Sequence, residues 1–210
     1  MSEDLKKGTT TLGIVCSDGI VIASERRATM GTLIAHKTTK KLYKIDEHLA
    51  ITVAGLVGDA QLLARWLKAE AELYKLKHDK EMSTKAAAAL MANIMARKGF
   101  FPFWVQLLIC GVDKDGGHVY SLDPAGGCIP DKYVTSGSGS PYVYGVLEDQ
   151  YKDEMSTEEG IDLAIRALNA AMKRDAVSGD GIDLAVITKT EFRELNDKEI
   201  NERKAKMNLN

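Results

Sequence analysis

Short runs of apolar residues that end at turn residues recur along the chain and predict β-strands. Several of these runs follow one another closely, which predicts antiparallel hairpins. The first two are joined by Asp18-Gly19, a dipeptide typical of a tight hairpin turn. The paired runs are residues 10–16 with 20–24, 41–45 with 49–54, and 105–112 with 118–122, and the single runs are residues 133–136 and 182–188.

Other segments place apolar residues every three to four positions, which is the spacing of one face of an α-helix. We expect Asp59 to cap the first of these helices, and Ser156 with Glu159 forms a capping-box pattern at the start of the last. The charged residues 190–210 predict a surface helix or a loose tail. The expected helices cover about residues 59–74, 83–97, 141–150 and 156–172.

The order of the predicted elements is strands, helices, strands, helices, strand. A strict alternation of strands and helices is missing, which argues against a doubly wound parallel sheet. Both helix pairs have an apolar stripe, so each pair needs a sheet to cover. The sequence therefore predicts an α+β sandwich of two largely antiparallel sheets with a helix layer on each outer face. We expect a single domain, because no linker composition divides the chain.

The composition is that of an ordinary globular protein. The 210 residues are 45% hydrophobic and 28% charged, with a formal net charge of −2. This charge favours neither nucleic acid nor an anionic membrane as a partner. The sequence has no apolar run as long as a membrane span requires, and residues 1–7 lack the apolar centre of a secretory signal.

Cysteine and histidine residues are scattered and predict neither a disulfide framework nor a metal site. The chain has three cysteines, an odd number, and they lie far apart in the sequence, at Cys16, Cys110 and Cys128. The four histidines show no spacing typical of metal ligands. We therefore expect no metal and no cofactor, and a reducing cytoplasm as the location of the protein.

Gly8-Thr9-Thr10-Thr11 precedes the first predicted strand and suggests a specific chemistry. A threonine hydroxyl is a poor nucleophile unless a base lies beside it. Cleavage after Gly8 would give Thr9 a free α-amine, whose ordinary pKa of about 7.7–8.0 suits it to accept a proton near neutral pH. Residues 1–8 are then interpreted as a removable pro-segment. A plain threonine-rich strand is the alternative.

Polar or glycine-containing clusters follow several predicted strands. Glu25 would end the second strand, and Lys41 would open the third and raise the positive potential near Thr9. Gly55 lies where a strand runs into a helix, so its backbone N–H is a candidate donor to an oxyanion. The small polar loops 136–140 and 174–179 could bind an amine or a carboxylate. The alternatives are a charged turn at Glu25, a surface lysine at Lys41, a tight turn at Gly55 and flexible loops at residues 136–140 and 174–179.

Taken together, these clusters resemble those of the β subunits of the proteasome core particle, most closely the archaeal form, from Thr9 to about Thr188. The family implies a four-layer αββα sandwich, the N-terminal nucleophile hydrolase fold. The matching stretches are GTTTLGIV, VIASERRATMG, AHKTTKKLYKID, TVAGLVGDAQ, TSGSGSPYVYGVLE and RDAVSGDGID.

The resemblance also implies residue roles in a threonine endopeptidase. Thr9 corresponds to the nucleophile that self-cleavage between Gly8 and Thr9 exposes, and Lys41 to the active-site lysine. Many eukaryotic relatives carry Asp at the position of Glu25, and the carboxylate role survives the extra methylene. The remaining matches are Glu25 as the acidic partner of the lysine, Gly55 as oxyanion donor, and Ser138, Asp175 and Ser178 as a polar network. By family position, the substrate pocket is lined by Ala28, Thr29, Thr39, Val53 and Val57.

The family further implies assembly with other β subunits and with α subunits in stacked heptameric rings, a particle of 28 subunits. A regulatory ATPase ring would act through the α rings, and unfolded proteins would be the substrates. Small, mostly apolar pocket residues predict cleavage after hydrophobic residues. Two alternatives keep the fold: a catalytically silent β-type subunit, and an amidase of the same fold class that acts on small molecules.

Overall fold

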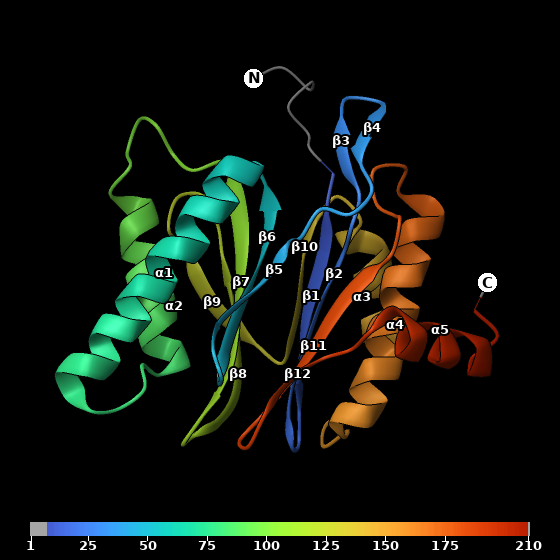
Figure 1. Ribbon diagram of the computed structural model, residues 1–210. Helices are drawn as coiled ribbons and strands as arrows, with labels where there is room; N and C mark the ends of the chain where they lie inside the picture. Colours follow the sequence, from blue (N-terminus) through green and yellow to red (C-terminus); the bar gives the residue numbers. More distant parts are fainter. Residues whose placement is uncertain (1–7, 210) are drawn as a thin grey trace.

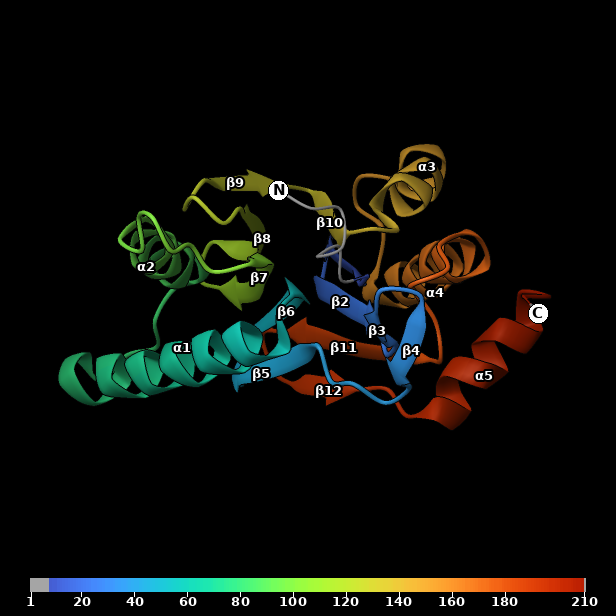
Figure 2. The ribbon, with the colours of Figure 1, turned by 90° about the horizontal axis from the view of Figure 1, so that it is seen from above.

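A computed structural model describes residues 8–209 of the chain. Two five-stranded antiparallel sheets pack face to face, and a pair of helices covers the outer face of each sheet (Figures 1 and 2). This arrangement confirms the predicted α+β sandwich. The elements appear in the expected order along the chain, so hairpin pairs build the sheets and helix pairs build the outer layers.

The first sheet has the order β10-β1-β2-β11-β12, and the second has the order β5-β6-β7-β8-β9. A separate hairpin of β3 and β4 projects beyond one end of the first sheet (Figure 1). The first sheet consists of β10 (Tyr133–Gly137), β1 (Thr10–Cys16), β2 (Gly19–Glu25), β11 (Ile182–Thr188) and β12 (Phe192–Glu194). The second consists of β5 (Leu42–Asp46), β6 (Leu49–Gly55), β7 (Val105–Asp113), β8 (Gly116–Leu122) and β9 (Cys128–Asp131), and the hairpin of β3 (Ala28–Met30) and β4 (Leu33–His36).

The helices cover the sheets in two pairs, with a fifth helix at the edge. The capping box at Ser156 and Glu159 is confirmed, with both of its hydrogen bonds formed. The C-terminal region forms a helix rather than a loose tail, and Ile200 is buried on its inner side. The pairs are α1 (Val57–His78) with α2 (Thr84–Ala96) and α3 (Ser140–Gln150) with α4 (Thr157–Arg174), and α5 (Asp197–Lys206) lies beside α4.

The prediction that Asp59 caps α1 is wrong. The helix begins at Val57, and Leu56 precedes it in an extended conformation. Asp59 lies in the first turn, and its Oδ2 atom accepts a hydrogen bond of 3.0 Å from the backbone N–H of Trp104. Its carboxylate therefore ties the start of α1 to the chain that enters β7, while still lying near the positive end of the helix dipole.

The core consists of three layers, which explains why several strands contain few polar residues. In β2, Val21 and Ala23 pack toward α4, whereas Ile20 and Ile22 pack between the two sheets. A strand covered on both faces has apolar residues at consecutive positions instead of alternate ones. Glu25 interrupts this run at the end of β2 and is completely buried.

Four strands were not predicted, namely β3, β4, β9 and β12. Each has three or four residues. These strands are too short for a period of two to be recognised, and β4 is exposed along its length. Across residues 8–209, the helices lack the combination of length and apolar character that a membrane span needs.

Candidate active site

The predicted catalytic residues come together at one end of the two sheets. There, a cavity of about 210 Å³ opens between the start of β1, the β3–β4 hairpin and the end of β6. Thr9, Lys41 and Gly55 line this cavity, together with all five predicted pocket residues. Gly8, predicted as the residue before the cleaved bond, also lines it, and the lining residues not predicted from the sequence are Met30, Ala35, His36, Lys40, Tyr43 and Ala60.

Thr9 is held in place at the start of β1 and beside the end of β10. Its side chain and backbone are buried, with 3% of the residue exposed. The Oγ1 hydroxyl donates a hydrogen bond of 2.7 Å to the carbonyl oxygen of Gly8, and the Thr9 carbonyl accepts one of 2.9 Å from the N–H of Ser138. The hydroxyl thus lies next to the peptide bond that self-cleavage would break.

Gly137 allows this close approach of the chain to Thr9. Its φ of 90° lies in a region that disfavours residues with a side chain, and a Cβ atom there would lie 1.8 Å from the Thr9 carbonyl oxygen. A larger residue would therefore separate the Thr9 carbonyl from the amide of Ser138.

Lys41 and Glu25 form a buried ion pair beside Thr9. Lys41 Nζ donates to Glu25 Oε1 and to the carbonyl oxygen of Arg27. Glu25 also accepts backbone hydrogen bonds of 3.2 Å from Thr10, 2.7 Å from Arg27 and 3.0 Å from Gly179. Because Glu25 accepts a hydrogen bond in each of these contacts, the arrangement favours its ionised carboxylate.

Burial shifts the pKa values of Glu25 and Lys41 in the directions that disfavour their charged forms. It raises the pKa of Glu25, and the Lys41 charge and the hydrogen bonds oppose that rise. It lowers the pKa of Lys41, and the Glu25 charge opposes that fall. Lys41 therefore holds its proton less tightly than an exposed lysine, which suits a group that exchanges a proton during a reaction.

Ser138, Asp175 and Ser178 form a connected hydrogen-bond network. Asp175 Oδ2 accepts 2.6 Å and 2.7 Å hydrogen bonds from the hydroxyls of Ser138 and Ser178. The Ser178 hydroxyl also lies 2.7 Å from that of Thr10. The loops that contain Ser138 and Asp175 are distant in the sequence, and this network joins them beside Thr9. The backbone N–H of Ser138 also donates to the Thr9 carbonyl.

Gly55 ends β6 in a conformation that suits glycine. Its φ is 137°, and a Cβ atom there would lie 2.1 Å from the carbonyl oxygen of Trp104. The next amide, that of Leu56, donates to this same carbonyl. Successive amides of a strand point to opposite sides, so the Gly55 N–H points away from β7, and Gly55 itself lines the cavity.

Arg27 supports the site but was not singled out from the sequence. Its Nε atom lies 2.6 Å from Asp180 Oδ2, and its Nη1 atom donates a 2.8 Å hydrogen bond to the carbonyl of Ala176. These contacts attach the loop that contains Asp175 to the end of β2. Arg27 lies in the stretch VIASERRATMG and Asp180 in RDAVSGDGID. Their opposite charges were the only sequence feature that could have suggested this ion pair.

Thiol chemistry does not compete with the threonine. Cys16 is buried, and burial raises its pKa to about 12. Burial also raises the pKa of Cys110, which is enclosed between the two sheets. A thiol that stays protonated at neutral pH is a weak nucleophile, so these side chains act as small apolar core residues.

Comparisons with known proteins find relatives along nearly the whole chain. The family model for the proteasome subunit matches residues 5–187. The chain is 57% identical to a proteasome subunit beta of Methanothermobacter thermautotrophicus over 203 residues, which cover 96% of this chain and 97% of that protein. It is 53% identical to the proteasome subunit beta of Methanosarcina thermophila, with the same coverage. It is 49% identical to that of Methanobrevibacter smithii, covering 99% of this chain and all of that protein.

Proposed function

The chain belongs to the proteasome subunit family and is a β subunit of the proteasome protease, and we propose that it is a threonine endopeptidase with the Thr9 hydroxyl as nucleophile. The observation that carries this proposal is the shared cavity of Thr9, Lys41 and Gly55. A nucleophile, a neighbouring positive charge that tunes its titration and an oxyanion donor are parts that hydrolysis of a peptide bond can use.

The first reaction in this proposal is removal of residues 1–8. The Thr9 hydroxyl attacks the carbonyl carbon of Gly8, and the C–N bond between Gly8 and Thr9 breaks as the Thr9 nitrogen takes the hydroxyl proton. Water then hydrolyses the resulting ester and releases residues 1–8 with a carboxylate at Gly8. The 2.7 Å hydrogen bond between Oγ1 and the Gly8 oxygen supports this step, because it places the two groups next to each other. Cleavage gives Thr9 the free α-amine that the later reaction uses.

In the mature enzyme, the Thr9 hydroxyl attacks a substrate carbonyl, and its proton passes through a bridging water to the Thr9 α-amine. Lys41, held by Glu25, adjusts the charge around these groups. The Gly55 N–H stabilises the tetrahedral oxyanion, an interaction worth about 2.7–4 kcal/mol in another protease. Collapse of this intermediate breaks the substrate C–N bond, and the leaving nitrogen takes the proton from the α-amine. Water then hydrolyses the acyl-enzyme, which releases the carboxylate product and restores Thr9.

The cavity lining supports a preference for cleavage after hydrophobic residues. Val53, Val57 and Ala28 supply apolar surface, and Ala60 and Met30 extend it. An extended substrate would pair with backbone groups near Thr29 and Gly55 as an added strand. The Thr29 hydroxyl is buried and lacks a hydrogen-bond partner within residues 8–209, which leaves it available to a substrate.

Exposed apolar side chains support assembly into a larger particle. Phe100, Phe101 and Leu76 are exposed to 100%, 86% and 83%. Side chains of this kind favour burial against a neighbouring subunit. We propose stacked heptameric rings of α and β subunits, a 28-subunit particle that receives unfolded proteins through the α rings from an ATPase ring. The proposed location is the cytoplasm, in keeping with three cysteines that do not form a disulfide within the described chain.

The test compares Thr9→Ala with Thr9→Ser in particles assembled with an α subunit. We expect the alanine variant to keep residues 1–8 and to hydrolyse no peptide, and the serine variant to retain both reactions at reduced rates. Intact mass and peptide turnover measure the two outcomes. Peptide hydrolysis by a pure Thr9→Ala particle would exclude Thr9 as the nucleophile. A wild-type chain that keeps residues 1–8 would instead indicate a silent subunit.

A further inference from the structure

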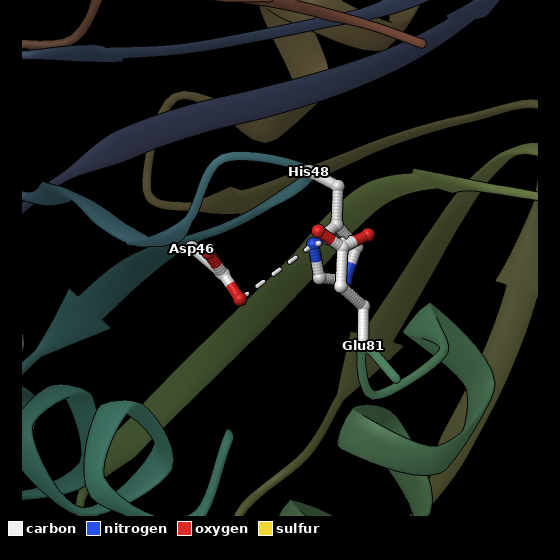
Figure 3. Close-up of side chains that lie close together, drawn as sticks. All are labelled: Asp46, His48 and Glu81. Carbon is white, nitrogen blue, oxygen red and sulfur yellow. Dashed lines mark ion pairs between the residues drawn. The ribbon is translucent and has the colours of Figure 1, made fainter. Parts of the chain in front are cut away.

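Asp46, His48 and Glu81 form a cluster of side chains (Figure 3). It lies at the start of β6, whereas Gly55 ends that strand at the catalytic cavity. Asp46 ends β5, His48 lies in the turn before β6, and Glu81 lies in the connection between α1 and α2. One ligand atom from each side chain lies within 4.8 Å of the other two. His48 is 7% exposed, and its Nδ1 atom is buried without a hydrogen-bond partner among residues 8–209.

The second nitrogen of His48 determines what Nδ1 can do. Nε2 lies 2.8 Å from the backbone carbonyl of Met82, which can only accept a hydrogen bond. Nε2 therefore carries a hydrogen, so in the neutral ring Nδ1 presents a lone pair. This lone pair faces Glu81 Oε2 at 3.6 Å and Asp46 Oδ2 at 3.9 Å. Three acceptor atoms, one from each side chain, thus surround a position that a cation could occupy.

Metal-binding histidines commonly show this arrangement, in which the remote nitrogen donates to a backbone carbonyl and orients the ring. The carboxylates are also free to bind. Asp46 Oδ1 accepts the N–H of Glu47, which leaves Oδ2 directed toward His48. Glu81 Oε1 lies 3.7 Å from Lys75 Nζ, but both side chains are half exposed, so this ion pair contributes little and can be displaced.

The spacing of the ligand atoms fits a small tetrahedral ion. Zinc bonds of about 2.0–2.2 Å to nitrogen and oxygen separate neighbouring ligands by about 3.3–3.6 Å. The distance between His48 and Glu81 already meets this requirement, and that between His48 and Asp46 exceeds it slightly. A small shift of the Asp46 side chain would close the distance to His48, and rotation of the half-exposed Glu81 side chain would bring its carboxylate closer to Asp46, with water in the fourth position.

We propose that Asp46, His48 and Glu81 bind a divalent transition-metal ion, with zinc as the preferred one. An imidazole with two carboxylates favours zinc over magnesium, which prefers oxygen ligands in an octahedral arrangement. Such an ion would attach the β5–β6 turn to the α1–α2 connection. The sequence spacing did not indicate a metal site, because Glu81 is distant from His48 in the chain and only the fold brings them together.

The role of this site is structural rather than catalytic. His48 precedes the seven residues of β6, and Gly55 ends that strand at the cavity. At about 3.3 Å per residue, β6 places about 20 Å between the cluster and the catalytic residues. We therefore expect zinc to protect the turn and the helix connection from local opening without changing peptide hydrolysis.

The test titrates metal-free, full-length assembled protein with zinc in a calorimeter. We expect one ion per chain, and affinity at least about tenfold lower in Glu81→Gln and Asp46→Asn, because each variant loses a charged ligand. These side chains are partly exposed, so both variants should fold, which circular dichroism checks. His118→Gln is the matched control, since His118 faces the single carboxylate of Asp113. Magnesium should not compete.

Two further measurements locate the ion. Zinc should slow hydrogen exchange of amides at residues 46–49 and 81–83 in the wild type and not in Glu81→Gln. Cobalt in place of zinc should show no thiolate charge-transfer band. Unchanged affinity in both ligand variants, a thiolate band that assigns the metal to a cysteine, or no stoichiometric zinc binding by the wild type would each overturn the proposal.

Discussion

The buried carboxylate of Glu25 offers the sharpest test of how the site is held together. Glu25→Gln keeps the shape of the side chain but replaces one oxygen by an NH₂ group. Oε1 accepts from Lys41 and Thr10, and Oε2 accepts from Arg27 and Gly179. Whichever way the amide is turned, its NH₂ group faces two donors.

The magnitude follows from burial. Glu25 is 0% exposed, so donors that lose their acceptor cannot turn to water. Each unsatisfied buried donor costs about 1–3 kcal/mol, and breaking a buried ion pair from one side costs about 3–5 kcal/mol. We expect the free energy of unfolding to fall by about 3–5 kcal/mol, a large part of the 5–15 kcal/mol typical of a domain.

Urea unfolding of the unassembled subunit, followed by tryptophan fluorescence, measures this loss, and intact mass after assembly measures removal of residues 1–8. Glu25→Asp is the matched control, because it keeps the negative charge and both oxygens while shortening the side chain. It should lose less stability than Glu25→Gln and retain self-cleavage. A Glu25→Gln protein within about 1 kcal/mol of the wild type, with normal self-cleavage, would refute the reasoning.

Three other predictions use different parts of the site. Gly137→Ala should lose about 2 kcal/mol or more in urea unfolding, because its Cβ would collide with the Thr9 carbonyl, whereas Gly145→Ala, in open space on α3, should be neutral or stabilising. Equal effects would contradict this. Arg27 lowers the pKa of Asp180, so their contact contributes stability above the ordinary pKa near 3.8 and loses it as pH falls through the lower folded value. Asp180→Asn should therefore flatten the decline of stability below about pH 4, and an unchanged pH profile would count against the ion pair. A fluorogenic peptide panel should show fastest cleavage after hydrophobic residues, and preferred cleavage after acidic or basic residues would refute the pocket assignment.

Much of the fold could be predicted because its strands and helices carry their own patterns. The apolar runs on either side of Asp18-Gly19 gave the β1–β2 hairpin, and the Ser156 capping box gave the start of α4. The short strands β3, β4 and β12 were missed, since three or four residues show no clear period. The Asp59 cap failed because a contact with the distant Trp104 N–H competes for its carboxylate.

The candidate site could be predicted in its residue types but not in its construction. The stretches around Thr9, Lys41 and Gly55 identified the chemistry through their resemblance to one family. The sequence contained no sign that Gly137 must lie against the Thr9 carbonyl, or that Arg27 would hold the loop of Asp180. Those contacts depend on the pairing of β1 with β10 and of β2 with β11, which joins segments far apart in the chain.

By itself, the amino-acid sequence determined the helices, the longer strands, their order and the residues able to react, because these depend on local periodicity, turn residues and side-chain chemistry. The tertiary structure decided which side chains meet. It buried Glu25 with Lys41, placed Gly55 in the lining of the cavity, and brought Glu81 to His48. The physical reason is that burial and distance set the strength of charges and hydrogen bonds, and both arise only when distant segments pack together.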